Sequence, residues 1–358
     1  MMIDCQALSL FLARSAFSDA ARIRTWRKLA EQVRYNFDLV RSFEVLRDRA
    51  KARRSPLAIT FGLILDRLYT GQALGSALRG LAPAEEVLLI AGGQDSGQLA
   101  QTLPLCVDLI EAKRDIVGSL VQALAYPALL LGMLVVLVVV IAVHVMPNIS
   151  MLVDPSRLTG AAATMHALSA SIASPAGAVV GVLFGLLLLL SLASLPHWTG
   201  PLRLRVESLP PWSFYRLVVG SVWLFTVATL MRGGMQLNQI FEAQLGTTNL
   251  SSWLRERVQA VHAEQALGKG LGEALADSGM RFPDEELVED LCMYSKLPRF
   301  HEQLDSMARD WLVNGVATIT RQAKVLNIVC LLAIVGLLCG VALAIGSLQQ
   351  QLSISGGF

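Results

Sequence analysis

The sequence predicts an all-α membrane protein with two homologous cytoplasmic helical bundles and three transmembrane helices. Residues 126–146, 176–195 and 325–348 are apolar and contain no Asp, Glu, Lys or Arg. Each stretch is close to the roughly 20 residues that a helix needs to cross a bilayer. Charged residues make up only 16% of the chain, against about 25% in an average globular domain. The deficit lies in these three stretches, and the two polar blocks outside them resemble each other.

The order of these segments predicts the domain organisation. Asp4 stands where a signal peptide needs a basic region, so we expect no cleaved signal. We expect an N-terminal segment at 1–16, a first bundle at 17–124, a transmembrane helix at 125–147, a short periplasmic loop at 148–175, a second transmembrane helix at 176–196, a second bundle at 197–324, a third transmembrane helix at 325–348 and a periplasmic tail at 349–358.

The positions of the basic residues predict the orientation, because Lys and Arg are enriched in cytoplasmic loops. Residues 147–175 contain one basic residue, Arg157, and the tail after residue 348 has no charge. We therefore expect a cytoplasmic N-terminus, two cytoplasmic bundles and a C-terminus on the opposite side of the membrane. The basic residues beside the apolar stretches are Lys113, Arg114, Arg203, Arg205, Arg216, Arg321 and Lys324.

A fourth apolar segment, residues 217–231, lies between Arg216 and Arg232. Its 15 residues make a helix of roughly 22 Å, which is shorter than the roughly 30 Å hydrocarbon core. A crossing here would also place the following basic block outside. We expect a buried bundle helix, and membrane association of this segment is the alternative.

Three short patterns of the first block recur in order in the second block, at offsets of 197 to 200 residues. Their helical spacing of apolar residues predicts a bundle of short helices in each block. Small differences in offset correspond to changes in loop length. The paired patterns are Leu39 and Phe43-Glu44 with Leu237 and Phe241-Glu242, Gly71-x-x-Leu74-Gly75-x-Ala77-Leu78 with Gly268-x-x-Leu271-Gly272-x-Ala274-Leu275, and Pro83-x-Glu85-Glu86 with Pro283-x-Glu285-Glu286.

Further motifs resemble those of a known family. Residues 93–99 read Gly-Gln-Asp-Ser-Gly-Gln-Leu, Tyr126-Pro127 opens the first apolar stretch and Pro147 follows it. This pattern resembles that of the inner-membrane platform protein family of type II secretion systems and type IV pili, over residues 17–348. The resemblance implies structural roles for Gly71, Gly75, Gly93, Ser96, Gly97, Leu99, Tyr126, Pro127, Pro147, Gly268 and Gly272.

The chain departs from the family pattern at several positions. Gln94 stands where the family usually has Glu, so an acidic site is not carried over to it. Residues 294–300 replace the glycine-rich turn in the second copy, and Leu326-Asn327 replaces Tyr-Pro. These departures suggest a divergent branch, of the type IVb or conjugative thin-pilus kind.

The resemblance implies a non-catalytic platform that couples a hexameric cytoplasmic ATPase to the insertion of pilin or pseudopilin subunits. Implied partners are that ATPase, pilins, other inner-membrane pilus components, membrane lipid and further copies of the chain. A small transporter or permease, or a membrane scaffold unrelated to pili, is the alternative. The net charge of +2 argues against a nucleic-acid footprint.

Two charged segments are candidate contacts. The basic run comprises Arg47, Arg49, Lys51, Arg53 and Arg54. It is either a solvated helix end or a surface for the ATPase, another acidic partner or anionic lipid. The second block is acidic at 284–290, where the first turn of a helix is the simpler interpretation. Opposite charges on the two copies could also set the register between protomers.

Glycines recur at intervals of four in the second and third apolar stretches, a spacing that lets helices approach closely in lipid. We expect Gly177, Gly181, Gly185, Gly336 and Gly340 to form a helix-packing face, within one protomer or between protomers. Ordinary glycine use in membrane helices is the alternative.

No motif indicates an enzyme, a cofactor or a metal site. Residues 92–97 lack the Gly-Lys-Ser/Thr ending of a phosphate loop, so we expect a tight turn between helices. The five histidines show no metal-binding spacing, and His144 is expected at the membrane interface rather than at a functional site within the membrane. The cysteines form no C-x-x-C pair, which argues against a zinc site.

Overall fold

The computed structural model describes residues 10, 12–145, 147–148, 161–209, 211–247, 250–295 and 300–355. Every element in these ranges is a helix. The chain divides into two compact units. The bundle unit comprises Met1–Val117 and Leu195–Asn314, and the membrane unit comprises Gly118–Ser194 and Gly315–Phe358.

The first repeat copy consists of five helices in the bundle unit. The side chain of Asp38 accepts a hydrogen bond from the backbone N–H of Arg41 and so starts α3. Apolar residues on one side of each helix, such as Phe43 and Leu29, are fully buried. The helices are α2 (Asp19–Arg34), α3 (Leu39–Ala52), α4 (Leu57–Tyr69), α5 (Leu74–Ala77) and α6 (Ala84–Asp95).

The second repeat copy follows the same order of helices. The side chain of Ser251 caps α14 through the backbone N–H of Leu254, and Gln236 and Gln239 cap α13 reciprocally. A short additional helix, α11 (Pro201–Val206), precedes this copy. Its helices are α12 (Trp212–Arg232), α13 (Leu237–Leu245), α14 (Ser252–Gln265), α15 (Leu271–Asp277) and α16 (Glu285–Tyr294).

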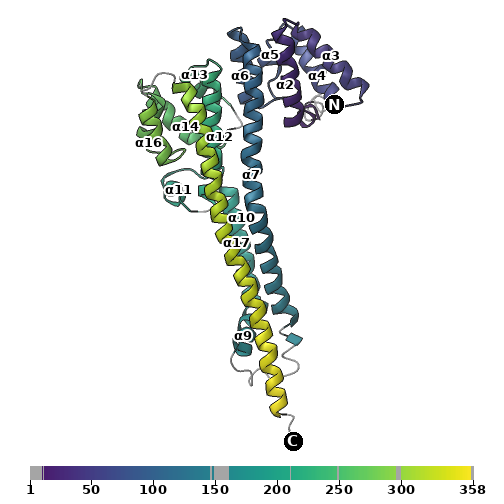
Figure 1. The fold of residues 1–358 in the computed structure, drawn as a ribbon, viewed down its shortest axis with the longest axis vertical. Coiled ribbons are helices and arrows are strands. Elements are labelled where there is room, and N and C mark those ends of the chain that lie inside the picture. Colours follow the sequence, from purple (N-terminus) through teal and green to yellow (C-terminus); the bar gives the residue numbers. More distant parts are fainter. Residues whose placement is uncertain are drawn as a thin grey trace. The chain divides into compact units, whose positions relative to one another are not determined.

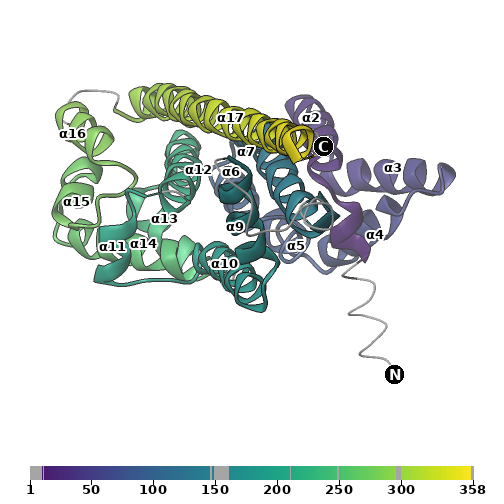
Figure 2. The same ribbon diagram turned by 90° about the horizontal axis from the view of Figure 1, so that it is seen from below.

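The two copies, expected as separate domains, pack together around one apolar core. Helices α6 and α12 lie between the group α2–α5 and the group α13–α16 (Figures 1 and 2). Phe43 and its counterpart Phe241 are both fully buried in this core.

Two long helices connect the units. Helix α7 (Leu99–Val140) follows α6, begins in the bundle unit and continues into the membrane unit, where the π-helical turn η1 (Ile141–Val145) follows it. Helix α17 (Phe300–Ser355) follows α16 in the same way. The membrane unit also contains α9 (Ala161–Ala173) and α10 (Pro175–Ser194).

Within the membrane unit, α7 and α17 contact each other through a small apolar cluster. Leu130 of α7 is buried with Cys330 and Ile334 of α17, and Leu134 and Leu137 pack against them. The segment 148–175, expected as a loop, contains helix α9, an element that the sequence analysis missed. The hydroxyl of Ser169 in α9 donates to the carbonyl of Ala142 in η1 at 3.0 Å.

Among the residues that the structure describes, helix α12 is one of four helices that are long and apolar enough to cross a membrane. Its 21 residues make it about 32 Å long, so the expectation of a 15-residue helix too short to cross was wrong. However, 56% of its apolar window is buried, whereas α10 has no buried residue. Burial rather than length therefore supports its interpretation as a bundle helix.

Candidate partner-binding surface

The basic run lies at the C-terminal end of α3 and in the turn that follows. Arg49, Lys51, Arg53 and Arg54 are exposed, whereas Arg47 is half-buried and donates to Asp48 at 3.0 Å. Arg54 has a positive φ of 50°, and the N–H of Ser55 donates to the carbonyl of Ala50. This bond closes the helix end, where cations are favoured by the helix dipole. The run is therefore a helix end that also presents four cations to solvent.

The acidic segment of the second copy is the first turn of α16. Asp284 is the N-cap residue, and Glu285 and Glu286 follow in the first turn, where negative charge is favoured. Asp284 accepts a hydrogen bond from Arg216 at 2.9 Å. Glu285, Glu286 and Glu289 are exposed, so they remain accessible to a partner.

The repeated glycine motif has the same role in both copies. Gly71 and Gly268 have positive φ angles of 81° and 84°, which glycine adopts without strain. A Cβ on Gly75 would lie 2.7 Å from the Cβ of Ala91, and a Cβ on Gly272 would lie 2.6 Å from the carbonyl oxygen of Leu291. Each glycine lets a short helix pack directly on the next long one. The accompanying residues Leu74, Ala77 and Leu78, and Leu271, Ala274 and Leu275, are all buried.

The expected turn at residues 92–97 is shorter than predicted. Gly92 and Gly93 lie inside α6, and a Cβ on Gly93 would overlap the Thr102 side chain at 1.9 Å. Only Gly97 has a positive φ, of 69°. Ser96 donates to the carbonyl of Gly92 at 2.8 Å, and Leu99 is buried at the start of α7.

Gln94, which stands in place of the family's glutamate, has a structural role. Its side-chain oxygen accepts a hydrogen bond from the backbone N–H of Leu74 at 2.8 Å. Leu74 is the first residue of α5, where backbone N–H groups have no partner within the helix. Either a glutamine or a glutamate oxygen can accept this bond. In the second copy, residues 296–299 of the corresponding segment lie outside the described residues.

The Tyr126-Pro127 pair lies within α7 rather than at a helix start, with Tyr126 exposed and Pro127 buried. Pro147 follows η1 and is exposed.

One alternative expected the glycines of the apolar stretches to pack helices of the same protomer together. The surroundings of Gly177, Gly181, Gly185 and Gly336 do not show such packing. No atom of the described chain lies within 4 Å of a Cβ built on Gly181, Gly185 or Gly336. Gly177 approaches only the end of the preceding helix, with 2.1 Å to the carbonyl oxygen of Ser171. Gly340 lies half-buried in α17. Packing between protomers therefore stays a prediction.

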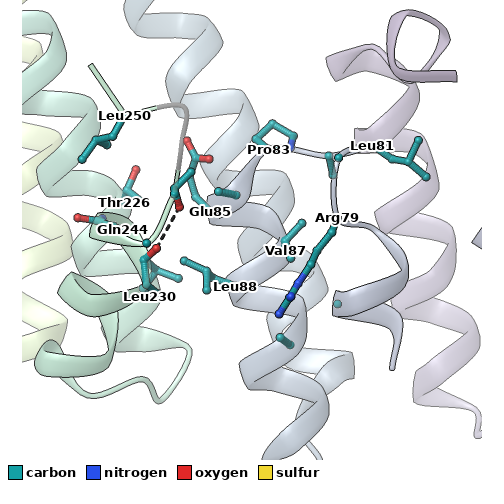
Figure 3. Close-up of a pocket in the computed structure, with 18 of the residues that line it drawn as sticks. Arg79, Leu81, Pro83, Glu85, Val87, Leu88, Thr226, Leu230, Gln244 and Leu250 are labelled. Atoms are coloured by element: carbon teal, nitrogen blue, oxygen red, sulfur yellow. Dashed lines mark hydrogen bonds between the residues drawn. The ribbon is translucent and has the colours of Figure 1, made fainter. Parts of the chain in front are cut away.

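A cavity of about 1000 Å³ separates the two repeat copies in the bundle unit. Leu81, Pro83, Val87 and Leu88 line it from the first copy, and residues of α12, α13 and the loop after α13 line it from the second (Figure 3). Arg79, which is exposed, also belongs to its lining (Figure 3). The cavity is a mainly apolar groove between the copies, with Glu85 in its lining and Arg79 at its edge.

Each copy contains a buried polar cluster that the sequence analysis did not identify. In the first, Glu86 accepts from Arg22 at 3.0 Å and from the indole N–H of Trp26 at 2.9 Å. Burial raises the pKa of Glu86, and Arg22 opposes this shift. Arg22 also donates to the carbonyl of Phe17 at 2.6 Å, so this cluster ties the start of α2 to α6.

In the second copy, the buried carboxylate of Glu207 accepts from Arg257 at 2.8 Å and from the indole N–H of Trp253 at 2.9 Å. Arg203 is fully buried, and its nearest acidic oxygen, on Glu207, is 4.0 Å away. None of its three guanidinium nitrogens has a hydrogen-bond partner among the described residues. Burial lowers the pKa of Arg203 to about 10.

Within the described residues, no group of three His, Cys, Asp or Glu side chains is placed to hold a metal ion. His144 lies in η1, next to the end of the first apolar stretch, and its backbone carbonyl accepts from the side chain of Asn148 at 2.8 Å.

Comparison with known proteins gives two kinds of match. A family model described as type II secretion system (T2SS), protein F, matches residues 26–147. Toxin coregulated pilus biosynthesis protein E of Vibrio cholerae serotype O1 is 23% identical over 294 residues, which are 82% of this chain and 85% of that protein. Type II secretion system protein F of Xanthomonas campestris pv. campestris is 25% identical over 294 residues, covering 77% and 69% respectively.

Proposed function

We propose that this chain, whose residues 26–147 match a family model described as type II secretion system protein F, is an inner-membrane platform for the assembly of a type IV pilus or a type II secretion pseudopilus. The platform is non-catalytic and couples a cytoplasmic ATPase to the insertion of pilin subunits. The relatives named for pilus biosynthesis and for secretion favour this function over a transporter or an unrelated scaffold.

One structural observation supports a coupling role. Each repeat copy is followed directly by a helix that begins in the bundle unit and ends in the membrane unit, α7 after α6 and α17 after α16. In the first copy, only residues 96–98 separate α6 from α7, so a displacement of this copy can act on an apolar helix through a short connection. Helix α10, which has no buried residue, leaves apolar surface for lipid, a pilin helix or a second protomer.

The orientation completes this proposal. Both repeat copies lie in the cytoplasm with the N-terminus, and the C-terminus is periplasmic, as the distribution of Lys and Arg favours. The partners are then a hexameric assembly ATPase on the cytoplasmic side, pilin or pseudopilin subunits in the membrane, other inner-membrane components and further copies of the chain.

The basic run is the proposed ATPase contact, because it presents four exposed cations on the first bundle copy. The test reverses two of them, Lys51→Glu with Arg53→Glu, in cells that assemble the filament. We expect filament assembly to be lost with the protein still at its normal level in the membrane.

The matched control exchanges the two cations for one another, Lys51→Arg with Arg53→Lys, and should assemble filaments normally. Loss of assembly in both double variants would indicate that the substitutions at positions 51 and 53 act through the structure and not through the change of charge. Normal assembly in the charge-reversed variant would contradict the assignment of this contact.

A further inference from the structure

The turns that join the first two helices of each copy have the same backbone conformation. Residues 34–37 in the first copy correspond to residues 232–235 in the second, at an offset of 198. Asn36 and Gly234 both have positive φ angles, of 56° and 88°. The same hydrogen bonds close both turns: Asn36 N to Val33 O and Phe37 N to Gln32 O in the first, and Gly234 N to Met231 O and Met235 N to Leu230 O in the second.

In the second copy, this turn forms the contact with the first copy. The Cδ2 atom of Leu89 in α6 lies 3.1 Å from where a Cβ would stand on Gly233. The Cγ atom of Met235 lies 3.2 Å from where a Cβ would stand on Gly92, also in α6. The turn after α12 therefore packs tightly on α6.

In the first copy, the corresponding turn carries large side chains on its surface. Tyr35, the counterpart of Gly233, is 72% exposed, and Phe37, the counterpart of Met235, is 59% exposed. Exposed aromatic side chains on a rigid turn are typical anchors of protein–protein contacts. The position that is buried in one copy is thus exposed and aromatic in the other.

The other half of this contact also has an exposed counterpart. Helix α16 corresponds to α6 at an offset of 200, so Glu289 corresponds to Leu89 and Cys292 to Gly92. Glu289 is exposed, and Cys292 is half-buried. One half of the contact therefore has its counterpart on α16 of the second copy. The other half has its counterpart on α2 of the first copy and the turn that follows it.

The charges on these two exposed halves are complementary. On α12, Val222 and Thr226 line the groove that faces the first copy. Their counterparts on α2 are Arg24 and Lys28, both exposed. On α16, the counterparts of Glu85 and Leu89 are the exposed carboxylates of Glu285 and Glu289, and Glu285 pairs with Arg281 of the same chain at 3.1 Å. The contact between α6 and α12 within the chain is apolar. The corresponding exposed surfaces are a basic face on α2 and an acidic face on α16.

We propose that α16 of one copy of this chain docks on α2 and the α2–α3 turn of a second copy, with a charged and aromatic contact in place of the close glycine contact that α6 makes with α12 and its turn. Such a contact is heterologous, with different surfaces on the two partners, and generates rings or open arrays. It gives a specific surface to the homo-oligomer expected in the proposed function.

This surface is separate from the end of α3 that carries the basic run. The α2–α3 turn adjoins the N-terminus of α3, and the 14 residues of this helix place its opposite end, where the exposed cations of the basic run lie, up to about 21 Å away. Tests of the two contacts can therefore give different results.

Disulfide formation tests the contact in the full-length protein in membranes. Because Met235 lies against Gly92, a cysteine in place of Phe37 should face the native Cys292 of a second copy, at a distance that a disulfide can close. The test variant carries Phe37→Cys, keeps Cys292 and has alanine at Cys5, Cys106, Cys330 and Cys339.

Under mild oxidation we expect Phe37→Cys to form covalent dimers and larger species that disappear on reduction. The matched control carries Tyr69→Cys in the same background, because Tyr69 is 57% exposed at the end of α4, outside the proposed surface. A yield from Phe37→Cys no higher than that from Tyr69→Cys would overturn the proposal, as would cross-linking that persists when Cys292 is also replaced.

Charge reversal provides a second arm. Adding Arg24→Glu and Lys28→Glu should lower the cross-linking yield about tenfold, because like charges then face each other. Adding Glu285→Lys and Glu289→Lys as well should restore it. An unchanged yield in the first variant would contradict the proposed register. The cross-linking yield is measured in membranes and does not require filaments. A variant that loses filaments but keeps its cross-linking yield therefore bears on the proposed function and not on the proposed contact.

Discussion

Gly272 packs so closely on Leu291 that a Cβ on the glycine would lie 2.6 Å from the leucine's carbonyl oxygen. In the first copy, Gly75 packs in the same way on Ala91, where a Cβ on the glycine would lie 2.7 Å from the Cβ of the alanine. The two copies therefore share the close approach of a short helix to the next long helix as well as a sequence pattern. Neither glycine can gain a side chain without a backbone shift.

Gly272→Ala should lower the free energy of unfolding by about 1–3 kcal/mol, because the added methyl group overlaps backbone atoms that cannot move independently. The measurement is the midpoint of thermal unfolding of the purified protein in detergent. Gly62→Ala is the control, because Gly62 lies within α4 with no atom within 4 Å of the added Cβ. It should keep the midpoint or raise it, as alanine favours helix by about 1 kcal/mol.

The repeat was the part of the fold that the sequence predicted best. The motif requires a glycine at a positive φ, a glycine at a close helix contact and three buried apolar residues. These requirements fix the residue types, and the second copy keeps them from Gly268 to Leu275. The family resemblance was confirmed by the match over residues 26–147. The all-helical class was confirmed as well.

The parts that were missed depend on contacts that leave no local pattern. Helix α9 lies in a segment whose many small residues give weak periodicity. The burial of Glu207 and Arg257 depends on α11 folding back on α14, across about 50 residues of sequence. The packing of the two copies into one unit depends on Leu89 and Gly233, which are 144 residues apart. The glycine spacing in α10 indicated a packing face, but a spacing cannot identify the helix that fills it.

The two buried arginines beside Glu207, Arg257 and Arg203, should respond differently to replacement. Arg257→Met leaves the buried carboxylate of Glu207 without its hydrogen-bonded ion-pair partner, with Arg203 still 4.0 Å away, and should lower the free energy of unfolding by about 3–5 kcal/mol. Arg203→Met removes a buried charge that has no hydrogen bond, so stability should change by less than about 1 kcal/mol or increase. Thermal midpoints of the two variants in detergent decide this. Equal losses in both would show that Arg203 is stabilised by contacts beyond those described.

The topology predicts which positions an impermeant thiol reagent can reach. In spheroplasts of a cysteine-free variant, Asn148→Cys should be labelled from outside, because it follows the first apolar segment. Arg281→Cys, which is exposed in the bundle unit, should be labelled only after the membrane is permeabilised. Labelling of Arg281→Cys in intact spheroplasts would place the second copy outside and would make α12 a membrane span.

Filament assembly in a strain that lacks only this protein tests the platform function most directly. The measurement is the amount of pilin or pseudopilin on the cell surface compared with the amount in the inner membrane. We expect surface subunits to be absent while processed subunits accumulate in the inner membrane, and expression of the intact chain should restore the surface filaments. Normal surface filaments in the deletion strain would contradict the central claim that this chain is the assembly platform.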